Sequence, residues 1–175
     1  MITPFRRFWL VPALVISGVT LIDQLTKAWL ISRVAGIPGS SLPVLGDWLK
    51  LTYVQNTGVA FGMFQNIPNL FVLTSIVISV GALYFYRYHL PNQHRLVQVC
   101  IGAIVGGAVG NIIDRVRLGY VIDFIHVTWF PGIFNFADSC ISCGVVALAV
   151  FLALRGEDAA PRTAPTDALS GDGQS

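Results

Sequence analysis

The most informative absence in this sequence is charge. Only 11% of the 175 residues are charged, whereas 54% are hydrophobic, and a typical soluble domain has roughly 25% charged residues. The net charge of +2 is small and the basic residues are scattered, so nucleic acid is not expected as a partner. A soluble fold could not bury this much apolar surface, and the composition therefore predicts a membrane protein.

Residues that build disulfides, metal sites and covalent intermediates are also scarce. The three cysteines all lie in apolar stretches: Cys100, Cys140 and Cys143. We interpret them as small buried hydrophobic residues rather than as a disulfide framework or a redox pair. The three histidines form no His-Glu-x-x-His cluster, and no Gly-x-Ser-x-Gly sequence occurs. We expect no metal and no other cofactor, which leaves carboxylates as the candidate catalytic groups.

Four apolar stretches are near the roughly 20 residues that a helix needs to cross a bilayer. They cover residues 8–31, 70–86, 96–113 and 133–154. The first follows Arg6 and Arg7 in the manner of a signal peptide, but no small-residue cleavage site follows, so we expect an uncleaved helix. The sequence predicts an all-α polytopic membrane domain over residues 1–155, with outer loops at 32–69 and 114–132.

Basic residues near the expected span ends favour one orientation. Five of them would lie on the cytoplasmic side with both termini: Arg6, Arg7, Arg87, Arg95 and Arg155. Four others would fall in the outer loops and count against this arrangement: Arg33, Lys50, Arg115 and Arg117. We expect both termini in the cytoplasm. Residues 156–175 are rich in Ala, Pro, Thr, Gly and Asp, which predicts a disordered cytoplasmic tail.

The first outer loop has the signals of a small surface structure. Residues 48–54 alternate apolar and polar side chains, with Leu51 and Tyr53 on the apolar side. This pattern predicts a half-buried strand in a small sheet on the membrane surface. Residues 59–64 are apolar but too short to span, so we expect a short interfacial helix, which nearby glycines make a candidate lid.

The third span carries glycines four residues apart on one helix face, at Gly102, Gly106 and Gly110. Small residues at this spacing let helix backbones approach closely in lipid. We interpret the stripe as a packing surface.

Asp123 and Asp138 are the candidate catalytic pair. Asp123 lies in a β-prone apolar run, and Asp138 lies at the outer end of the fourth span. A carboxylate at a membrane surface is costly to keep, so its default interpretation is functional. If the connector folds back, the two carboxyl groups share a proton, and one acts as base on a water while the other polarises a carbonyl.

Each acid also has a structural interpretation that spacing leaves open. Asp138 is close enough to a helix start to serve as a cap, and Asp123 could pair with Arg115 or Arg117. Two amide side chains beside apolar stretches are suited to hydrogen-bonding a peptide backbone or a neighbouring loop: Asn56 and Asn135.

Other charged residues near the spans have structural interpretations. Asp23 and Lys27 are four residues apart in the first span, which predicts a buried ion pair, although Lys27 could instead extend to the membrane surface. Asp114 beside Arg115 is interpreted as a pair that holds a loop.

Five short motifs occur in order along the chain. They are Asp23-x-x-x-Lys27, Asn56-Thr57-Gly58-Val59-Ala60-Phe61, Gly110-Asn111-Ile112-Ile113-Asp114-Arg115, Val121-Ile122-Asp123-Phe124 and Phe134-Asn135-Phe136-Ala137-Asp138-Ser139. Together, over roughly residues 8–154, the chain resembles the bacterial lipoprotein signal peptidase family, signal peptidase II.

The resemblance implies an aspartic endopeptidase of the bacterial inner membrane, with Asp123 and Asp138 as its dyad. It implies cleavage of diacylglyceryl-modified prolipoproteins before the lipidated cysteine, at the periplasmic face. The family's fold is four transmembrane helices with a small periplasmic β-cradle and a short interfacial helix. The residues implied to bind substrate or support the site are Asn56, Gly58, Asn111, Arg115, Asn135, Asp23, Lys27 and Asp114. We expect prolipoprotein substrates and membrane lipid as partners, and a monomer.

A second class of function stays open on the residues alone. A small membrane transporter or proton-relay subunit could use four acids as relay groups: Asp23, Asp114, Asp123 and Asp138. Their clustering toward one membrane face counts against a transport path. A scaffold subunit is a third possibility, and it predicts that loss of either Asp123 or Asp138 is harmless.

Overall fold

The computed structural model describes residues 4–34, 37–58 and 68–159 of the chain. Its elements, in order, are α1 (Pro4–Arg33), β1 (Ser41–Leu45), β2 (Leu49–Asn56), α2 (Pro68–Tyr88), α3 (Arg95–Leu118), β3 (Val121–Val127), β4 (Ile133–Phe134) and α4 (Phe136–Ala159). The interfacial helix and lid predicted at residues 59–64, and the predicted tail from residue 160 on, lie outside the described residues.

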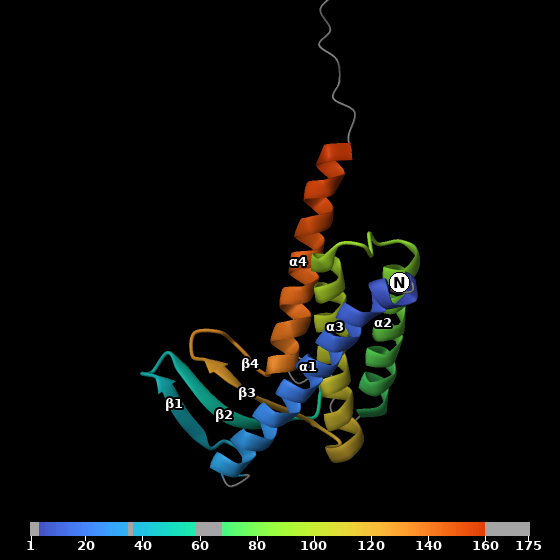
Figure 1. Cartoon of the computed structure of the whole chain (residues 1–175). Coiled ribbons are helices and arrows are strands. Elements are labelled where there is room, and N and C mark those ends of the chain that lie inside the picture. The colour runs from blue at the N-terminus through green and yellow to red at the C-terminus, as the bar shows by residue number, and fades with distance from the viewer. Residues whose placement is uncertain (1–3, 35–36, 59–67, 160–175) are drawn as a thin grey trace, which may run out of the picture.

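Among the described residues, four helices are long and apolar enough to cross a membrane: Phe8–Arg33, Leu70–Tyr88, Arg95–Leu118 and Phe136–Arg155. They stand side by side as a bundle, and the small sheet lies beside one end of it (Figure 1). The start of α1 and the end of α4 both lie toward the opposite end of the bundle from the sheet (Figure 1). The predicted fold class is therefore confirmed in its four spanning helices and its small sheet.

Several predicted boundaries differ from the observed ones. The apolar pattern predicts residues 133 and 134 as part of the fourth span, but they form strand β4, and α4 continues through Ala159, four residues into the predicted tail. Helix α3 extends through Asp114 and Arg115 to Leu118, where Gly119 ends it with φ 82° and donates its N–H to the Arg115 carbonyl. The hydropathy pattern predicts the end of a span at the first polar residues, whereas the helix itself continues until a capping residue ends it.

Helix α3 packs against each of the other three helices and lies at the centre of the bundle. A Cβ added at Gly102 would lie 2.6 Å from the Val15 Cβ, and one at Gly106 would lie 3.0 Å from the Ile16 carbonyl oxygen, both on α1. One at Gly110 would lie 2.5 Å from an Asp23 carboxylate oxygen. The predicted glycine stripe is confirmed as the surface on which α1 packs.

Gly107, on the side of α3 that faces α4, makes an equally close approach and supports a stability prediction. A Cβ there would lie 2.5 Å from the Ala137 carbonyl oxygen, at the start of α4. We expect Gly107→Ala to lower the free energy of unfolding by about 1–3 kcal/mol, because backbone atoms of α4 must shift. Thermal unfolding of the purified protein in detergent measures this.

Gly18→Ala is the matched control for that variant. Gly18 lies within α1, and a Cβ there meets no atom within 4 Å. Because alanine favours helix over glycine by about 1 kcal/mol, this variant should be at least as stable as the parent. Equal unfolding temperatures for Gly107→Ala and the parent would show that α3 and α4 are not closely packed.

The sheet is antiparallel in the order β1-β2-β3-β4. On strand β2, Leu51 and Tyr53 pack into a core cluster, as the alternation predicted. On the other face the Thr52 hydroxyl bonds the Ser41 hydroxyl at 2.9 Å and the His126 Nδ1 at 3.1 Å. These polar side chains lie outside the core cluster.

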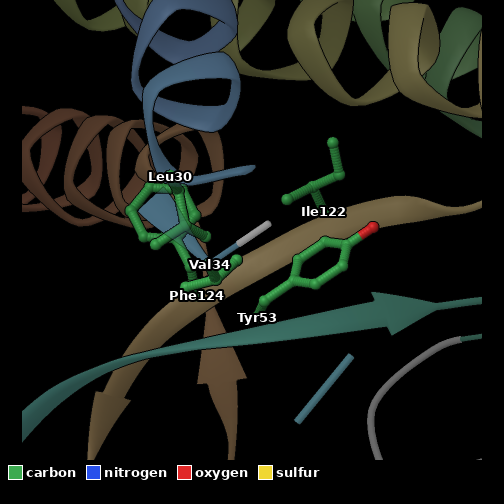
Figure 2. Close-up of a cluster of buried hydrophobic side chains, with 5 residues drawn as sticks. All are labelled: Leu30, Val34, Tyr53, Ile122 and Phe124. Atoms are coloured by element: carbon green, nitrogen blue, oxygen red, sulfur yellow. The ribbon is translucent and has the colours of Figure 1, made fainter. Parts of the chain in front are cut away.

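The apolar face of the sheet packs on the end of α1. The cluster contains Leu30 from α1, Val34 directly after it, Tyr53 from β2, and Ile122 and Phe124 from β3 (Figure 2). Each of these side chains is at most 6% exposed. Because alternate residues of a strand point to opposite faces, burial of Ile122 and Phe124 turns the residue between them to the other face. This fixes the direction of Asp123.

Candidate active site

Asp123 is held by two amide side chains. It is 2% exposed. Its Oδ1 accepts a hydrogen bond from Asn135 Nδ2 and its Oδ2 accepts one from Asn56 Nδ2, each at 2.8 Å. Asn56 is oriented in turn by the Gly58 N–H, which donates to its Oδ1 at 3.0 Å. The carboxylate is therefore fixed in direction while being almost entirely removed from water.

Asp138 lies in the first turn of α4, where it completes a reciprocal cap. The Asp138 N–H donates to Asn135 Oδ1 at 2.9 Å, and the Asn135 N–H donates to Asp138 Oδ2 at 3.3 Å. This is the geometry of a capping box. Asp138 thus has the helix-start role that its position predicted, although Asn135 is the capping residue. Its Oδ1 accepts from Asn111 Nδ2 at 2.8 Å, so both carboxylate oxygens have donors.

Asn135 joins the two acids. Its side chain is fully buried and contacts Asp123 through Nδ2 and the Asp138 backbone through Oδ1. Its Nδ2 also donates to Asn111 Oδ1 at 3.1 Å. A single buried amide thus bonds both the Asp123 carboxylate and the backbone of Asp138, and the structure brings the two acids together through it.

The environment of Asp123 raises its pKa from 3.8 to about 6. Burial is the largest cause, and the negative charge of Asp138 adds to it. Hydrogen bonds from Asn56 and Asn135 and the charge of Lys27 act in the opposite direction, because they favour the ionised form. Asp123 is consequently a carboxyl group that gains or loses a proton near neutral pH.

Beneath the two acids lies a buried ion cluster. Lys27 is 1% exposed, and its Nζ lies 2.8 Å from Asp23 Oδ2 and 2.8 Å from Asp114 Oδ2. The predicted Asp23–Lys27 pair is confirmed, and the alternative in which Lys27 reaches the membrane surface is wrong. The same Nζ donates to Asn111 Oδ1 at 3.2 Å, which connects the cluster to Asp138.

The predicted Asp114–Arg115 pair is not present. Asp114 pairs with Lys27 of α1, and its Oδ2 accepts the Ile122 N–H at 3.1 Å, so it holds the start of β3. Consecutive helix residues point in different directions, which separates the two side chains. Arg115 lies with its Cζ 5.5 Å from the centre of the Phe71 ring.

The structural alternative for Asp123 is also wrong. Among the described residues, neither Arg115 nor Arg117 forms an ion pair with it; the ion pairs there involve only Lys27 and Lys50. Arg115 nevertheless lies close enough to Asp123 and Asp138 to interact with them electrostatically.

Gln24 is a member of the cluster that sequence reasoning missed. Its Nε2 lies 2.9 Å from Asp114 Oδ1, 3.2 Å from Asp23 Oδ2 and 3.2 Å from the Gly110 carbonyl oxygen. A polar amide inside an apolar span, next to an aspartate, was the available signal. Asp23 extends the network to α4, where its Oδ1 accepts the Ala137 N–H at 3.1 Å.

The cysteines and the acids do not build a metal centre in the part of the chain that the structure describes. No group of three or more His, Cys, Asp or Glu side chains there is arranged to hold an ion. The three cysteines are free thiols: Cys100 is buried, Cys140 is half-buried and Cys143 is exposed. The expectation that all three are buried is wrong for Cys143.

Comparison with known proteins shows the family to which this chain belongs. The profile of the family described as Signal peptidase (SPase) II matches residues 15–154. The chain belongs to the signal peptidase II family. It is therefore related to proteases, and with four candidate spans it is a multi-pass inner-membrane protein.

Curated relatives support this membership over most of the chain. The lipoprotein signal peptidase of Caldanaerobacter subterraneus is 40% identical over 142 residues, which cover 81% of this chain and 95% of the relative. That of Caulobacter vibrioides is 42% identical over 151 residues, covering 82% and 86%. That of Moorella thermoacetica is 42% identical over 130 residues, covering 74% and 84%.

Two solved structures share the fold of this signal peptidase II family member. One bacterial membrane enzyme superimposes with a TM-score of 0.77 at 29% identity, covering 87% of this chain and 93% of that structure. A second superimposes with a TM-score of 0.71 at 33% identity, covering 81% and 91%. The helical bundle and the sheet are thus arranged as in known membrane enzymes.

Proposed function

We propose that this signal peptidase II family member is an aspartic endopeptidase that removes signal peptides from diacylglyceryl-modified prolipoproteins. The bond cleaved is the one before the lipidated cysteine, and Asp123 and Asp138 are the catalytic pair. The observation that carries the proposal is the connection of these two acids, from β3 and α4, through the buried amide of Asn135. The name lipoprotein signal peptidase, carried by the curated relatives, supports the substrate class.

The chemistry requires one ionised and one protonated carboxyl group. The ionised one takes a proton from water as the water oxygen attacks the scissile carbonyl carbon, and the protonated one donates its proton to the carbonyl oxygen. Collapse of the tetrahedral adduct breaks the C–N bond and re-forms the C=O bond: the leaving nitrogen takes up the first proton, and one hydroxyl of the adduct returns its proton to the carboxylate that had donated one. The raised pKa of Asp123 supports it as the group that is protonated at the start.

The position of the pair suits a substrate held partly in lipid. Asp123 and Asp138 lie where the sheet meets the bundle, on β3 and at the start of α4. In the proposed orientation this is the periplasmic end, and both termini are cytoplasmic. The acyl chains of the substrate then stay in the bilayer while water reaches the peptide bond, and the membrane supplies part of the positioning.

The surrounding residues have distinct proposed roles. Asn56, Gly58 and Asn135 orient Asp123, and Asn111 orients Asp138. The ion cluster of Asp23, Lys27 and Asp114 holds α1, α3 and the start of β3 together beneath the pair. Arg115 is the proposed contact for a carbonyl oxygen of the substrate. The proposed functional unit is a monomer.

The test of the substrate class is the mass of the products. The purified protein in detergent is incubated with a diacylglyceryl-modified prolipoprotein, and with the same polypeptide lacking the lipid as control. The expected product has the lipidated cysteine at its new N-terminus, and the unmodified polypeptide remains intact. Equal cleavage of both substrates would contradict the requirement for lipid, and intact substrates together with proton flux in vesicles would favour the relay alternative.

The pH dependence of cleavage tests the role of Asn56. Because the protonated form of Asp123 is proposed to be active, kcat/KM should fall as pH rises through the pKa of about 6. Asn56 stabilises the ionised form, so Asn56→Ala should raise this pKa by about one unit and move the decline to higher pH. Thr57→Ala, at an exposed neighbour, is the control and should leave the profile in place. A shift to lower pH in Asn56→Ala would contradict the assignment.

A further inference from the structure

We propose that an aromatic tip of the sheet inserts into the interface of the same bilayer that the helices cross and anchors the sheet there. The tip is made by the turn between β1 and β2 and the turn between β3 and β4. Its apolar residues are Leu45, Trp48, Trp129 and Phe130. It is separate from the acidic pair.

The two turns form one unit. The Trp48 carbonyl oxygen accepts the Thr128 N–H at 3.0 Å, and the neighbouring pair Leu49 and Val127 is in register across β2 and β3. Trp48 and Trp129, together with Asp47 and Thr128, line a shallow depression of about 470 Å³. The aromatic side chains are thus presented together by backbone hydrogen bonds.

The tip is unusually apolar for a surface in water. Leu45 is 66% exposed, Trp48 is 69% exposed and Trp129 is 73% exposed. Transfer of an apolar side chain from water into lipid lowers the free energy. An indole carries both an apolar body and an N–H, so it is best placed at a membrane–water interface. The composition of the tip therefore matches the interfacial layer of a bilayer.

The position of the tip brings a bilayer within reach. The sheet leaves the bundle sideways, and the ends of β1 and β2 at this tip are the part of it that lies farthest from the helices (Figure 1). It emerges near the end of α1 and the start of α4, which are ends of spanning segments. A sheet that extends sideways at this level runs along the membrane surface rather than away from it.

The charges at the tip indicate that its contact with lipid is not electrostatic. Asp47 lies at the tip, and its Oδ1 is 3.3 Å from the Nζ of Lys50, so the charges of this pair cancel. A neutral pair does not attract anionic headgroups, and the binding energy must come from the apolar and aromatic side chains. Contact should then persist at 1 M salt, where electrostatic interactions are screened within about 3 Å.

The experiment measures the fluorescence of a protein with a single tryptophan at the tip. The chain has four tryptophans, and Trp9→Phe, Trp29→Phe and Trp48→Phe together leave only Trp129. This protein is placed in plain vesicles, in vesicles brominated near the headgroup, and in vesicles brominated near the acyl-chain end. Activity in detergent verifies the fold, and the quenching itself does not depend on the proposed cleavage.

We expect roughly twofold weaker emission with the shallow bromine label than in plain vesicles, and less quenching with the deep label, because indole prefers the interface. The same result at high salt supports the proposal. Equal emission in all vesicles overturns it: full quenching by iodide then places the tip in water, and protection from iodide places it against protein. Lipid quenching that disappears at high salt also overturns it.

A second variant connects the tip to turnover. Trp48→Ser with Trp129→Ser should raise KM several-fold for substrate in vesicles while leaving kcat, and cleavage in detergent, unchanged. Tyr88→Ser, at an exposed aromatic residue of α2, is the matched control and should leave KM unchanged. An unchanged KM in the tip variant would show that the sheet needs no anchor there.

Discussion

Replacement of Lys27 by methionine is expected to destabilise the fold by about 3–5 kcal/mol, because it leaves buried carboxylates without their cation. Asp23 is fully buried and Asp114 is 2% exposed, and the Lys27 Nζ lies 2.8 Å from an oxygen of each. Methionine retains the length and most of the volume of lysine. The change therefore removes charge and hydrogen bonds with little change in packing.

Two comparison variants serve as controls for the Lys27→Met measurement. Lys50→Met removes a partly exposed lysine whose partner Asp47 is in water, and it should cost less than about 1 kcal/mol. Adding Asp23→Asn and Asp114→Asn to Lys27→Met removes the unpaired charges, and it should recover part of the lost stability. The readout is thermal unfolding in detergent. A parent-like unfolding temperature for Lys27→Met would contradict the buried ion cluster.

The ion cluster also affects the acidic pair. The Lys27 Nζ donates to Asn111 Oδ1, which leaves Asn111 Nδ2 to donate to Asp138. Without the lysine, the amide of Asn111 loses one of the two donors that fix its direction, the other being Asn135. Any Lys27→Met protein that remains folded should therefore turn over substrate more slowly as well.

Local sequence patterns predicted much of the fold, because the residues that form each of these features lie close in sequence or recur at one regular spacing. The four spans follow from hydropathy, and the strand around Leu51 and Tyr53 follows from alternation. The glycine stripe of α3 and the Asp23–Lys27 pair each depend on a spacing of four residues within one helix. These features need no knowledge of which distant segments meet.

The parts of the site that could not be predicted depend on distant contacts. The sequence gives no sign that Asp114 pairs with Lys27, 87 positions earlier, rather than with its neighbour Arg115. Asn135 could be recognised as a polar residue near a helix start. Its bridge between Asp123 and Asp138, however, requires β3 to return to the start of α4, which only tertiary packing determines.

Asp123→Asn and Asp138→Asn are each expected to lower kcat/KM by about a thousandfold or more, since general acid–base catalysis by one group contributes about 10² to 10⁴ and the two groups act together. Asparagine keeps the size of the side chain and one acceptor oxygen but cannot exchange the proton. In Asp138→Asn the remaining oxygen can still accept the Asn135 N–H, so the start of α4 should persist.

Stability separates loss of chemistry from loss of fold in Asp123→Asn. The pKa of Asp123 is raised from 3.8 to about 6, so the folded protein binds more protons than the unfolded chain between these values, and stability falls as pH rises through this window. Ionisation at pH 7.5 costs up to about 3 kcal/mol at 1.36 kcal/mol per unit. Asparagine at position 123 removes this cost, although either Asn56 or Asn135 then loses the carboxylate oxygen that accepts its hydrogen bond. Asp123→Asn should unfold no earlier than the parent at pH 7.5.

The most direct test is therefore a side-by-side measurement of turnover. The purified parent, Asp123→Asn and Asp138→Asn are each given diacylglyceryl-modified prolipoprotein, and the product beginning with the lipidated cysteine is followed by mass spectrometry. We expect cleavage by the parent and none above background by either variant. Thermal unfolding measurements should show that all three proteins are folded. Near-parental turnover by either variant would contradict the catalytic pair and make that aspartate a structural residue.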